Sequence, residues 1–135
     1  MKKTQNKPDC AGELPIEAVR GLKLFNDGEY WKAHEALEEA WLAESDPVGN
    51  LYKGILQAGV TYLHIERGNY RGAIKVYRRA MRWLEKYPAT CKGIEVAQLR
   101  ADLSAAIAEV KRLGPDRMAQ FDPELFKPVI WAPSE

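Results

Sequence analysis

The two histidines of the sequence, His34 and His64, are the side chains best suited to acid–base or metal chemistry. At 100° per residue, His34 falls inside the apolar stripe of a helix expected over 30–43, and Glu38 lies one turn later on the border of that stripe. A buried histidine needs a hydrogen-bond partner, because an unpaired buried polar group costs about 1–3 kcal/mol. We expect Glu38, at i+4, to be that partner.

A second polar stripe belongs to the helix expected over 49–67, which is otherwise apolar nearly all round. The stripe consists of Lys53, Gln57, Thr61 and His64. If the connection over 45–49 is tight, the two helices are antiparallel neighbours and their polar residues converge between them. The candidate site then consists of His34, Glu35, Glu38, Trp41, Gln57 and His64.

Three interpretations of this candidate site stay open. It is a buried hydrogen-bond network or a solvent-facing stripe, or it is a pocket for a small polar or anionic ligand with the histidines and Gln57 as donors. In the third interpretation it is a metal site with His34, Glu38 and His64 as ligands. Two histidines and one carboxylate suffice for a divalent metal with a bound water, so such a metal is the cofactor that these residues suggest.

A basic face is expected on the helix over 69–86, because its cationic residues fall within an arc of about 100°. These residues are Arg71, Lys75, Arg78, Arg79, Arg82 and Lys86. One interpretation is a weak nucleic-acid surface. The other is a solvated face, or one paired with Glu35, Glu38 and Glu39. The balanced charge, 20 Lys+Arg against 19 Asp+Glu, favours the second, so nucleic acid is not the expected partner.

The elements that must position these residues all have helical periodicity. Helices are expected over 15–26, 30–43, 49–67, 69–86 and 94–113, with turn signals such as Asp27-Gly28 and Gly114-Pro115 between or after them. The fold class is therefore all-α, a single compact bundle of five helices. We expect residues 1–13 to form a mobile arm, residues 14–135 a single domain, and residues 115–135 an extended tail packed on the bundle.

An internal repeat relates two of the expected helices. Gly28-Glu29-Tyr30 recurs forty positions later as Gly68-Asn69-Tyr70, and Ala33 and Ala40 match Ala73 and Ala80. Both helices thus begin with the same turn and present the same small buried positions. Two copies are too few for a solenoid, so we interpret them as two similar helical hairpins within the bundle.

Composition excludes several classes of protein. The 135 residues are 46% hydrophobic and 29% charged, as in folded globular domains rather than disordered chains. The start of the chain lacks the apolar core of a signal peptide, and the most apolar stretch, 51–65, is interrupted by Lys53, Gln57 and His64. Cys10 and Cys91 are too few for a disulfide scaffold and suit a reducing cytosol. We therefore expect a cytoplasmic protein without a membrane span.

Two stretches resemble a known family. The run 25–41, from Phe25 to Trp41, and the run from Lys53 through His64 to Ala73 are similar to the signature of the bacterial and archaeal domain of unknown function 309. The resemblance covers about 22–87 and implies a small all-helical domain without an assigned activity. Its marked positions here are His34, Glu35, Glu38, Trp41, Gln57, His64, Gly68, Asn69, Gly72 and Ala73.

The function expected from the sequence is a non-catalytic module that binds a small ligand, a protein partner or a second copy of the chain. One alternative is a metal-dependent, hydrolase-like enzyme that uses the two histidines and Glu38. The other is weak nucleic-acid binding through the basic face of the helix over 69–86.

Overall fold

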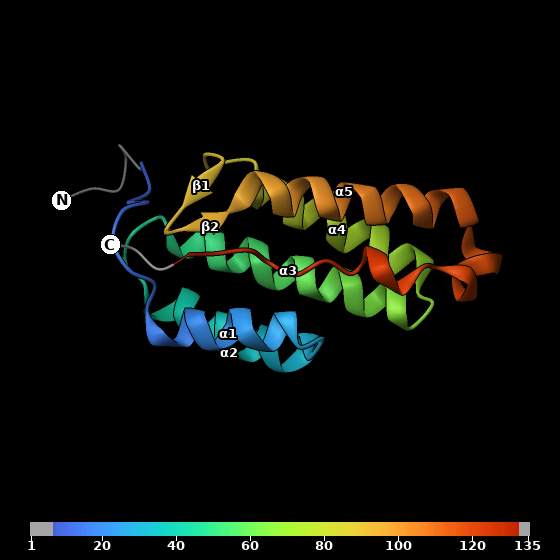
Figure 1. Ribbon diagram of the computed structural model, residues 1–135, viewed down its shortest axis with the longest axis horizontal. Helices are drawn as coiled ribbons and strands as arrows, with labels where there is room; N and C mark the ends of the chain where they lie inside the picture. Colours follow the sequence, from blue (N-terminus) through green and yellow to red (C-terminus); the bar gives the residue numbers. More distant parts are fainter. Residues whose placement is uncertain (1–6, 133–135) are drawn as a thin grey trace.

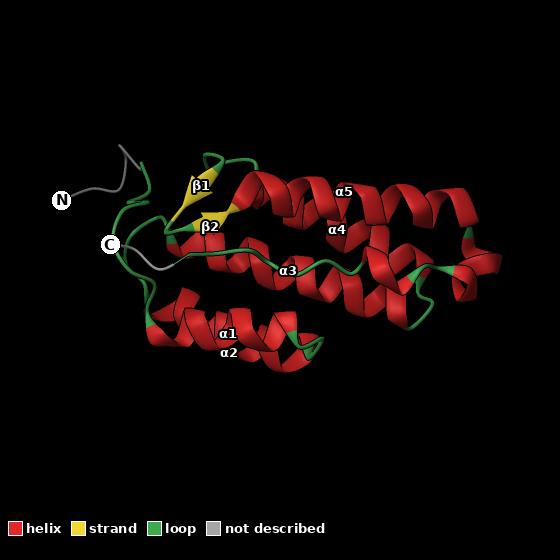
Figure 2. Ribbon diagram, in the orientation of Figure 1, coloured by secondary structure: helices red, strands yellow, loops and turns green. Residues whose placement is uncertain are grey.

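The computed structural model describes residues 7–132 as an all-α bundle with one small hairpin (Figure 2). Its α-helices are α1 (Ile16–Asn26), α2 (Tyr30–Ala43), α3 (Gly49–Glu66), α4 (Tyr70–Leu84) and α5 (Val96–Leu113). The hairpin consists of β1 (Thr90–Cys91) and β2 (Ile94–Glu95), and the 3-10 helices η2 (Pro115–Gln120) and η3 (Pro123–Leu125) follow α5. None of the helices in this range is both long and apolar enough to cross a membrane. The expected fold class is confirmed.

Helix α3 forms the centre of the bundle, because it is apolar on most of its circumference. It packs against α2 on one side and against α4 on the other, while α1 packs against α2 and α5 lies beside α4 (Figure 1). Tyr52, Ile55, Ala58 and Tyr62 of α3 are fully buried. The buried Thr61 of α3 finds its partner within the helix, because its hydroxyl donates to Gln57 O at 2.9 Å.

The turns before α2 and α4 have the same geometry, as the repeat predicts. Gly28 and Gly68 both have positive φ, +80° and +70°, where a side chain would be strained. The residue after each glycine donates its N–H to a carbonyl five residues back, at 2.9 Å in both turns. The caps differ, because Asn69 Oδ1 accepts a hydrogen bond from Gly72 N whereas Glu29 makes no side-chain cap.

The start of α5 differs from the prediction. Residues 94–95 were expected to be helical, but they form β2, which pairs antiparallel with β1 in the register Cys91–Ile94. Lys92 and Gly93, both with positive φ, form the two-residue turn between the strands. Two-residue strands are too short to produce a detectable period, and β2 gains a further bridge from Trp131 of the distant tail.

The tail returns along the bundle after η3 and crosses α3 (Figure 1). Asn26 attaches it by two hydrogen bonds, donating from Nδ2 to Val129 O at 2.9 Å and accepting at Oδ1 from Val129 N at 2.8 Å. The ring of Phe126 packs against Tyr30 and Tyr62, with centroids 6.3 and 5.2 Å away. The tail therefore covers part of the core that five helices alone leave open.

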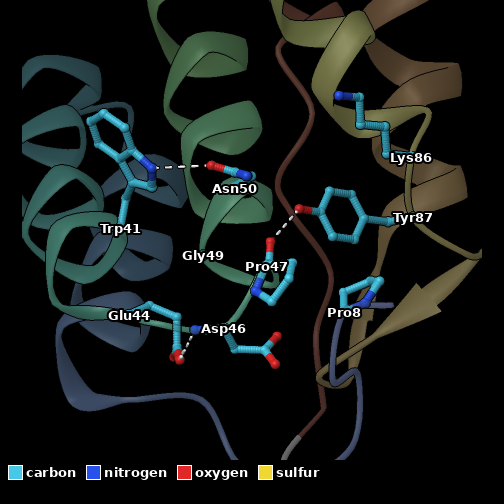
Figure 3. A pocket seen from close by; sticks show the side chains of 9 residues that line it. All are labelled: Pro8, Trp41, Glu44, Asp46, Pro47, Gly49, Asn50, Lys86 and Tyr87. Atoms are coloured by element: carbon cyan, nitrogen blue, oxygen red, sulfur yellow. Dashed lines mark hydrogen bonds between the residues drawn. The ribbon is translucent and has the colours of Figure 1, made fainter. Parts of the chain in front are cut away.

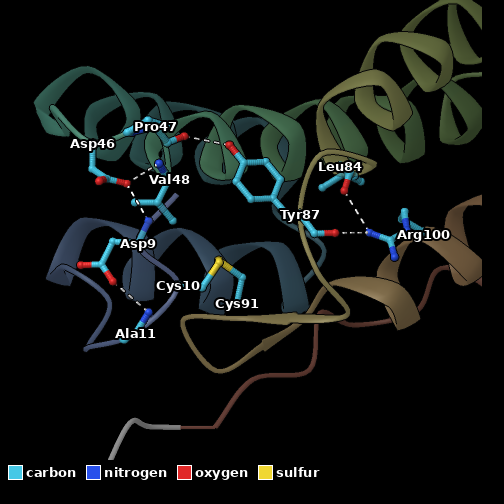
Figure 4. Close-up of a disulfide and its surroundings, with 10 residues drawn as sticks. All are labelled: Asp9, Cys10, Ala11, Asp46, Pro47, Val48, Leu84, Tyr87, Cys91 and Arg100. Carbon is cyan, nitrogen blue, oxygen red and sulfur yellow. Dashed lines mark hydrogen bonds between the residues drawn. A yellow bond between two sulfur atoms is a disulfide. The ribbon is translucent and has the colours of Figure 1, made fainter. Parts of the chain in front are cut away.

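The segment before α1 is linked to the hairpin by a disulfide between Cys10 and Cys91 (Figure 4). Lys92 N donates to Cys10 O at 2.7 Å, and Asp9 N donates to Asp46 Oδ2 at 3.0 Å. The interpretation of the cysteines as reduced thiols is thus corrected, because folding brings together two residues 81 positions apart. Residues 1–6 of the expected arm lie outside the described residues, and the mobility of 1–13 stays a prediction.

Candidate functional site

His34 lies on α2 against Trp31 rather than against Glu38. The imidazole and indole rings are stacked, with centroids 4.9 Å apart and planes 9° apart. His34 Nδ1 is buried and has no hydrogen-bond partner within residues 7–132. The expected His34–Glu38 pair is therefore wrong: stacking on Trp31, one turn earlier, holds the imidazole plane.

His64 lies near the end of α3, where it contacts the start of α4. Asn69 Nδ2 is 3.1 Å from His64 Nδ1, and because Asn69 Oδ1 already accepts from Gly72 N, the imidazole nitrogen is the acceptor in this pair. An added Cβ at Gly72 would lie 2.9 Å from His64 Nδ1, so this contact requires a glycine. Desolvation and the nearby charge of Arg67 lower the pKa of His64 below its usual 6.5.

Hydrogen bonds do not connect the four polar residues that were expected to converge. No hydrogen bond in the described part of the chain joins any two of His34, Glu38, Gln57 and His64. Residues 7–132 contain no group of three or more His, Cys, Asp or Glu side chains that could hold a metal ion. The three candidate metal ligands are therefore not assembled. Of the two other predicted site residues, Glu35 is exposed, and Trp41 Nε1 donates to Asn50 Oδ1 at 3.1 Å.

Gln57 does line a cavity, but one that lies between α3 and α4. The cavity has a volume of about 310 Å³ and is lined by Lys53 and Gln57 of α3 and by Arg79, Arg82 and Trp83 of α4. We refer to it as the cationic cavity. Gln57 Oε1 is buried and has no hydrogen-bond partner among the described residues.

Lys53 is positioned by two tryptophans. Its Nζ lies 4.5 Å from the ring centroid of Trp41 on α2 and 4.8 Å from that of Trp83 on α4. Lys86 Nζ lies 4.7 Å from Trp83 as well. These cation–π contacts hold the Lys53 ammonium between two helices without neutralising its charge.

Sequence reasoning identified three of the five residues that line the cationic cavity. Gln57 belonged to the predicted polar site, and Arg79 and Arg82 belonged to the predicted basic face. Lys53 and Trp83 were not predicted as site residues. The signal for Lys53 was present, since it occupies the same polar stripe as Gln57 one turn earlier.

The basic face of α4 is exposed to solvent along its whole length. All six of its cationic residues are exposed. The ion pairs within residues 7–132 are Arg20–Glu39 at 3.2 Å and Arg112–Glu109, so none of them involves α4. The expected alternative of pairing with Glu35, Glu38 and Glu39 is therefore not observed. The charge of this face is free to act on a ligand.

Comparison with known proteins agrees with the resemblance found in the sequence. Residues 18–76 match the family model described as "Domain of unknown function (DUF309)", a range that contains His34, Gln57 and His64 but ends before Arg79. An "Uncharacterized protein" of Aquifex aeolicus (strain VF5) is 28% identical over 91 residues. That match covers 67% of this chain and 27% of the relative, so the chain spans about a quarter of that protein's length.

Proposed function

We propose that this chain is a ligand-binding helical module whose cationic cavity takes a small anion. The observation that carries the proposal is the convergence of three cations, Lys53, Arg79 and Arg82, on one cavity that Gln57 also lines. No carboxylate lines this cavity. An anion that enters it therefore meets only favourable charge.

The donor set suits a phosphate ester better than a carboxylate. Two guanidinium groups and one ammonium can donate to several oxygens of one phosphate, and arginine does so in a planar, bidentate geometry. Gln57 adds an amide to the lining, and an amide nitrogen can donate to a phosphate oxygen.

In the first experiment, isothermal titration calorimetry measures the binding of inorganic phosphate and of pyrophosphate to the protein at low ionic strength. We expect saturable binding at one site. Replacing Arg82 by Gln should weaken it about tenfold or more, because a charge-assisted hydrogen bond contributes about 1.5–3 kcal/mol. A higher salt concentration should also weaken the binding of phosphate to the unmodified protein, since the cavity is open to solvent.

The matched control is Arg78→Gln, which removes the same charge from α4 at a position that does not line the cationic cavity. Its affinity for phosphate should stay close to that of the unmodified protein. Equal losses in the Arg78 and Arg82 variants would mean that phosphate senses only the overall charge of the helix, and the proposal would be abandoned.

A further inference from the structure

A second cavity has a different chemical character from the cationic cavity (Figure 3). Its volume is about 340 Å³, within the range of small-ligand sites. Trp41 lies on one side, and Tyr87 and Pro8 lie on the other (Figure 3). We refer to it as the aromatic cavity. These walls favour a flat ring over an extended aliphatic chain.

The two cavities share a border. Trp41 lines the aromatic cavity, and Lys53 of the cationic cavity lies over its ring. Lys86, which also lines the aromatic cavity, lies over the ring of Trp83, a wall of the cationic cavity. A ligand in one cavity therefore lies next to side chains that contact the wall of the other.

The charges of the two cavities give such a ligand a direction. Carboxylates of Glu44 and Asp46 line the aromatic cavity, whereas the cationic cavity has cations alone. A phosphate in the aromatic cavity would face these carboxylates, so the cationic cavity is the better place for it. A ring that carries N–H groups suits the carboxylate oxygens, which act as acceptors.

Asn50 adds a group that can recognise such a ring. Its Oδ1 accepts a hydrogen bond from Trp41 Nε1, so the amide is held in one orientation and its nitrogen points away from the indole (Figure 3). Tyr87 is fixed in turn, because its hydroxyl donates to Pro47 O at 2.8 Å. The polar groups and the ring walls of the cavity are thus positioned before any ligand arrives.

We propose that the two cavities together bind a nucleoside phosphate, with the phosphate in the cationic cavity and the base in the aromatic cavity between Trp41 and Tyr87. This inference rests on the proposed function, because the phosphate contributes the anion. The inference adds to that proposal the chemical class of the ligand and the residues of the aromatic cavity as a second part of the binding site. The base contributes stacking and hydrogen bonds to Asn50 and Glu44.

The test compares ribose 5-phosphate with the four ribonucleoside 5′-monophosphates by calorimetry. We expect at least one monophosphate to bind about tenfold or more tightly than ribose 5-phosphate, as stacking of one base on aromatic side chains contributes this much. Tyr87→Leu should remove that advantage and leave the affinity for ribose 5-phosphate within about twofold, because Tyr87 lines the aromatic cavity and not the cationic cavity. Trp31→Leu, which changes an exposed tryptophan outside both cavities, should have no effect on either ligand.

A second variant keeps the test valid if Tyr87→Leu does not fold, as judged by circular dichroism. Asn50→Ala should lower the affinity for the preferred monophosphate and not that for ribose 5-phosphate. Oligonucleotides with a 5′-phosphate distinguish the source of the ligand. Binding of the mononucleotide alone indicates a free nucleotide, and tighter binding of the oligonucleotide indicates the end of a strand.

The possible failures are distinguishable. Equal affinities for ribose 5-phosphate and all four monophosphates, with binding still dependent on Arg82, would overturn the inference and leave the proposed function standing. If no phosphate compound binds, both are overturned.

Discussion

At the scale of single residues, two buried polar atoms without hydrogen-bond partners lie in different surroundings. His34 Nδ1 and Gln57 Oε1 are both buried without a hydrogen-bond partner within residues 7–132. Gln57 lines the cationic cavity, whereas His34 is stacked on the ring of Trp31 and lines neither the cationic nor the aromatic cavity. An unpaired polar atom indicates a binding site only where space for a partner lies beside it.

We predict that His34 is replaceable by an apolar ring. His34→Phe keeps the stacking on Trp31 and removes the unpaired nitrogen, so the free energy of unfolding should be unchanged or higher. His34→Ala loses the stacking and should lower that free energy by about 1 kcal/mol. Urea denaturation followed by circular dichroism measures both. A larger loss in the Phe variant than in the Ala variant would show that the imidazole has a polar role.

At the scale of elements, the start of α4 depends on a chain of hydrogen bonds that the start of α2 lacks. Asn69 caps α4 through Gly72 N and also donates to His64 of α3. His64 can accept this bond only while Nδ1 is unprotonated. The junction between α3 and α4, which positions the arginines of the cationic cavity, is therefore sensitive to pH.

We predict that acidification destabilises the protein through His64. The pKa of His64 is lowered in the folded state by desolvation and by Arg67, so the unfolded state binds a proton more readily. The free energy of unfolding should therefore fall as the pH decreases through about 6.5, the unfolded value. Denaturation curves between about pH 8 and pH 5 should show a steeper fall for the unmodified protein than for His64→Gln. Identical slopes would contradict this assignment.

At the scale of the whole molecule, the two ends of the described chain are both attached to the hairpin. Cys10 is bonded to Cys91 of β1, and Trp131 forms a bridge with Ile94 of β2. The segment that the disulfide anchors also contributes Pro8 to the aromatic cavity. Because the two cysteines are paired, they no longer support a reducing compartment. A cytoplasmic location stays a prediction.

Reduction of this disulfide should cost considerable stability. Closing a loop of 81 residues contributes about 4–5 kcal/mol in the chain-entropy description. We expect a reducing agent to lower the midpoint of urea denaturation, and Cys10→Ser/Cys91→Ser to lower it similarly without a reducing agent. The double variant should not respond to the reducing agent. Equal midpoints for the oxidised, reduced and variant proteins would mean that the bond has no stabilising effect.

The sequence by itself determined the features that depend on near neighbours. The bounds of α2, the left-handed glycines at 28 and 68 and the cap at Asn69 were predictable, because periodicity, turn chemistry and capping act within a few residues. The polar stripe of α3 and the basic face of α4 were predictable for the same reason.

Only the tertiary structure decided which of these faces meet. Gln57 was expected to face His34, yet it shares a cavity with Arg79 and Arg82, because α3 has neighbours on both sides and helical period does not determine which strip each residue enters. The disulfide and the β2–Trp131 bridge join residues far apart in the sequence. Such contacts are set by the packing of the whole chain, which no local pattern records.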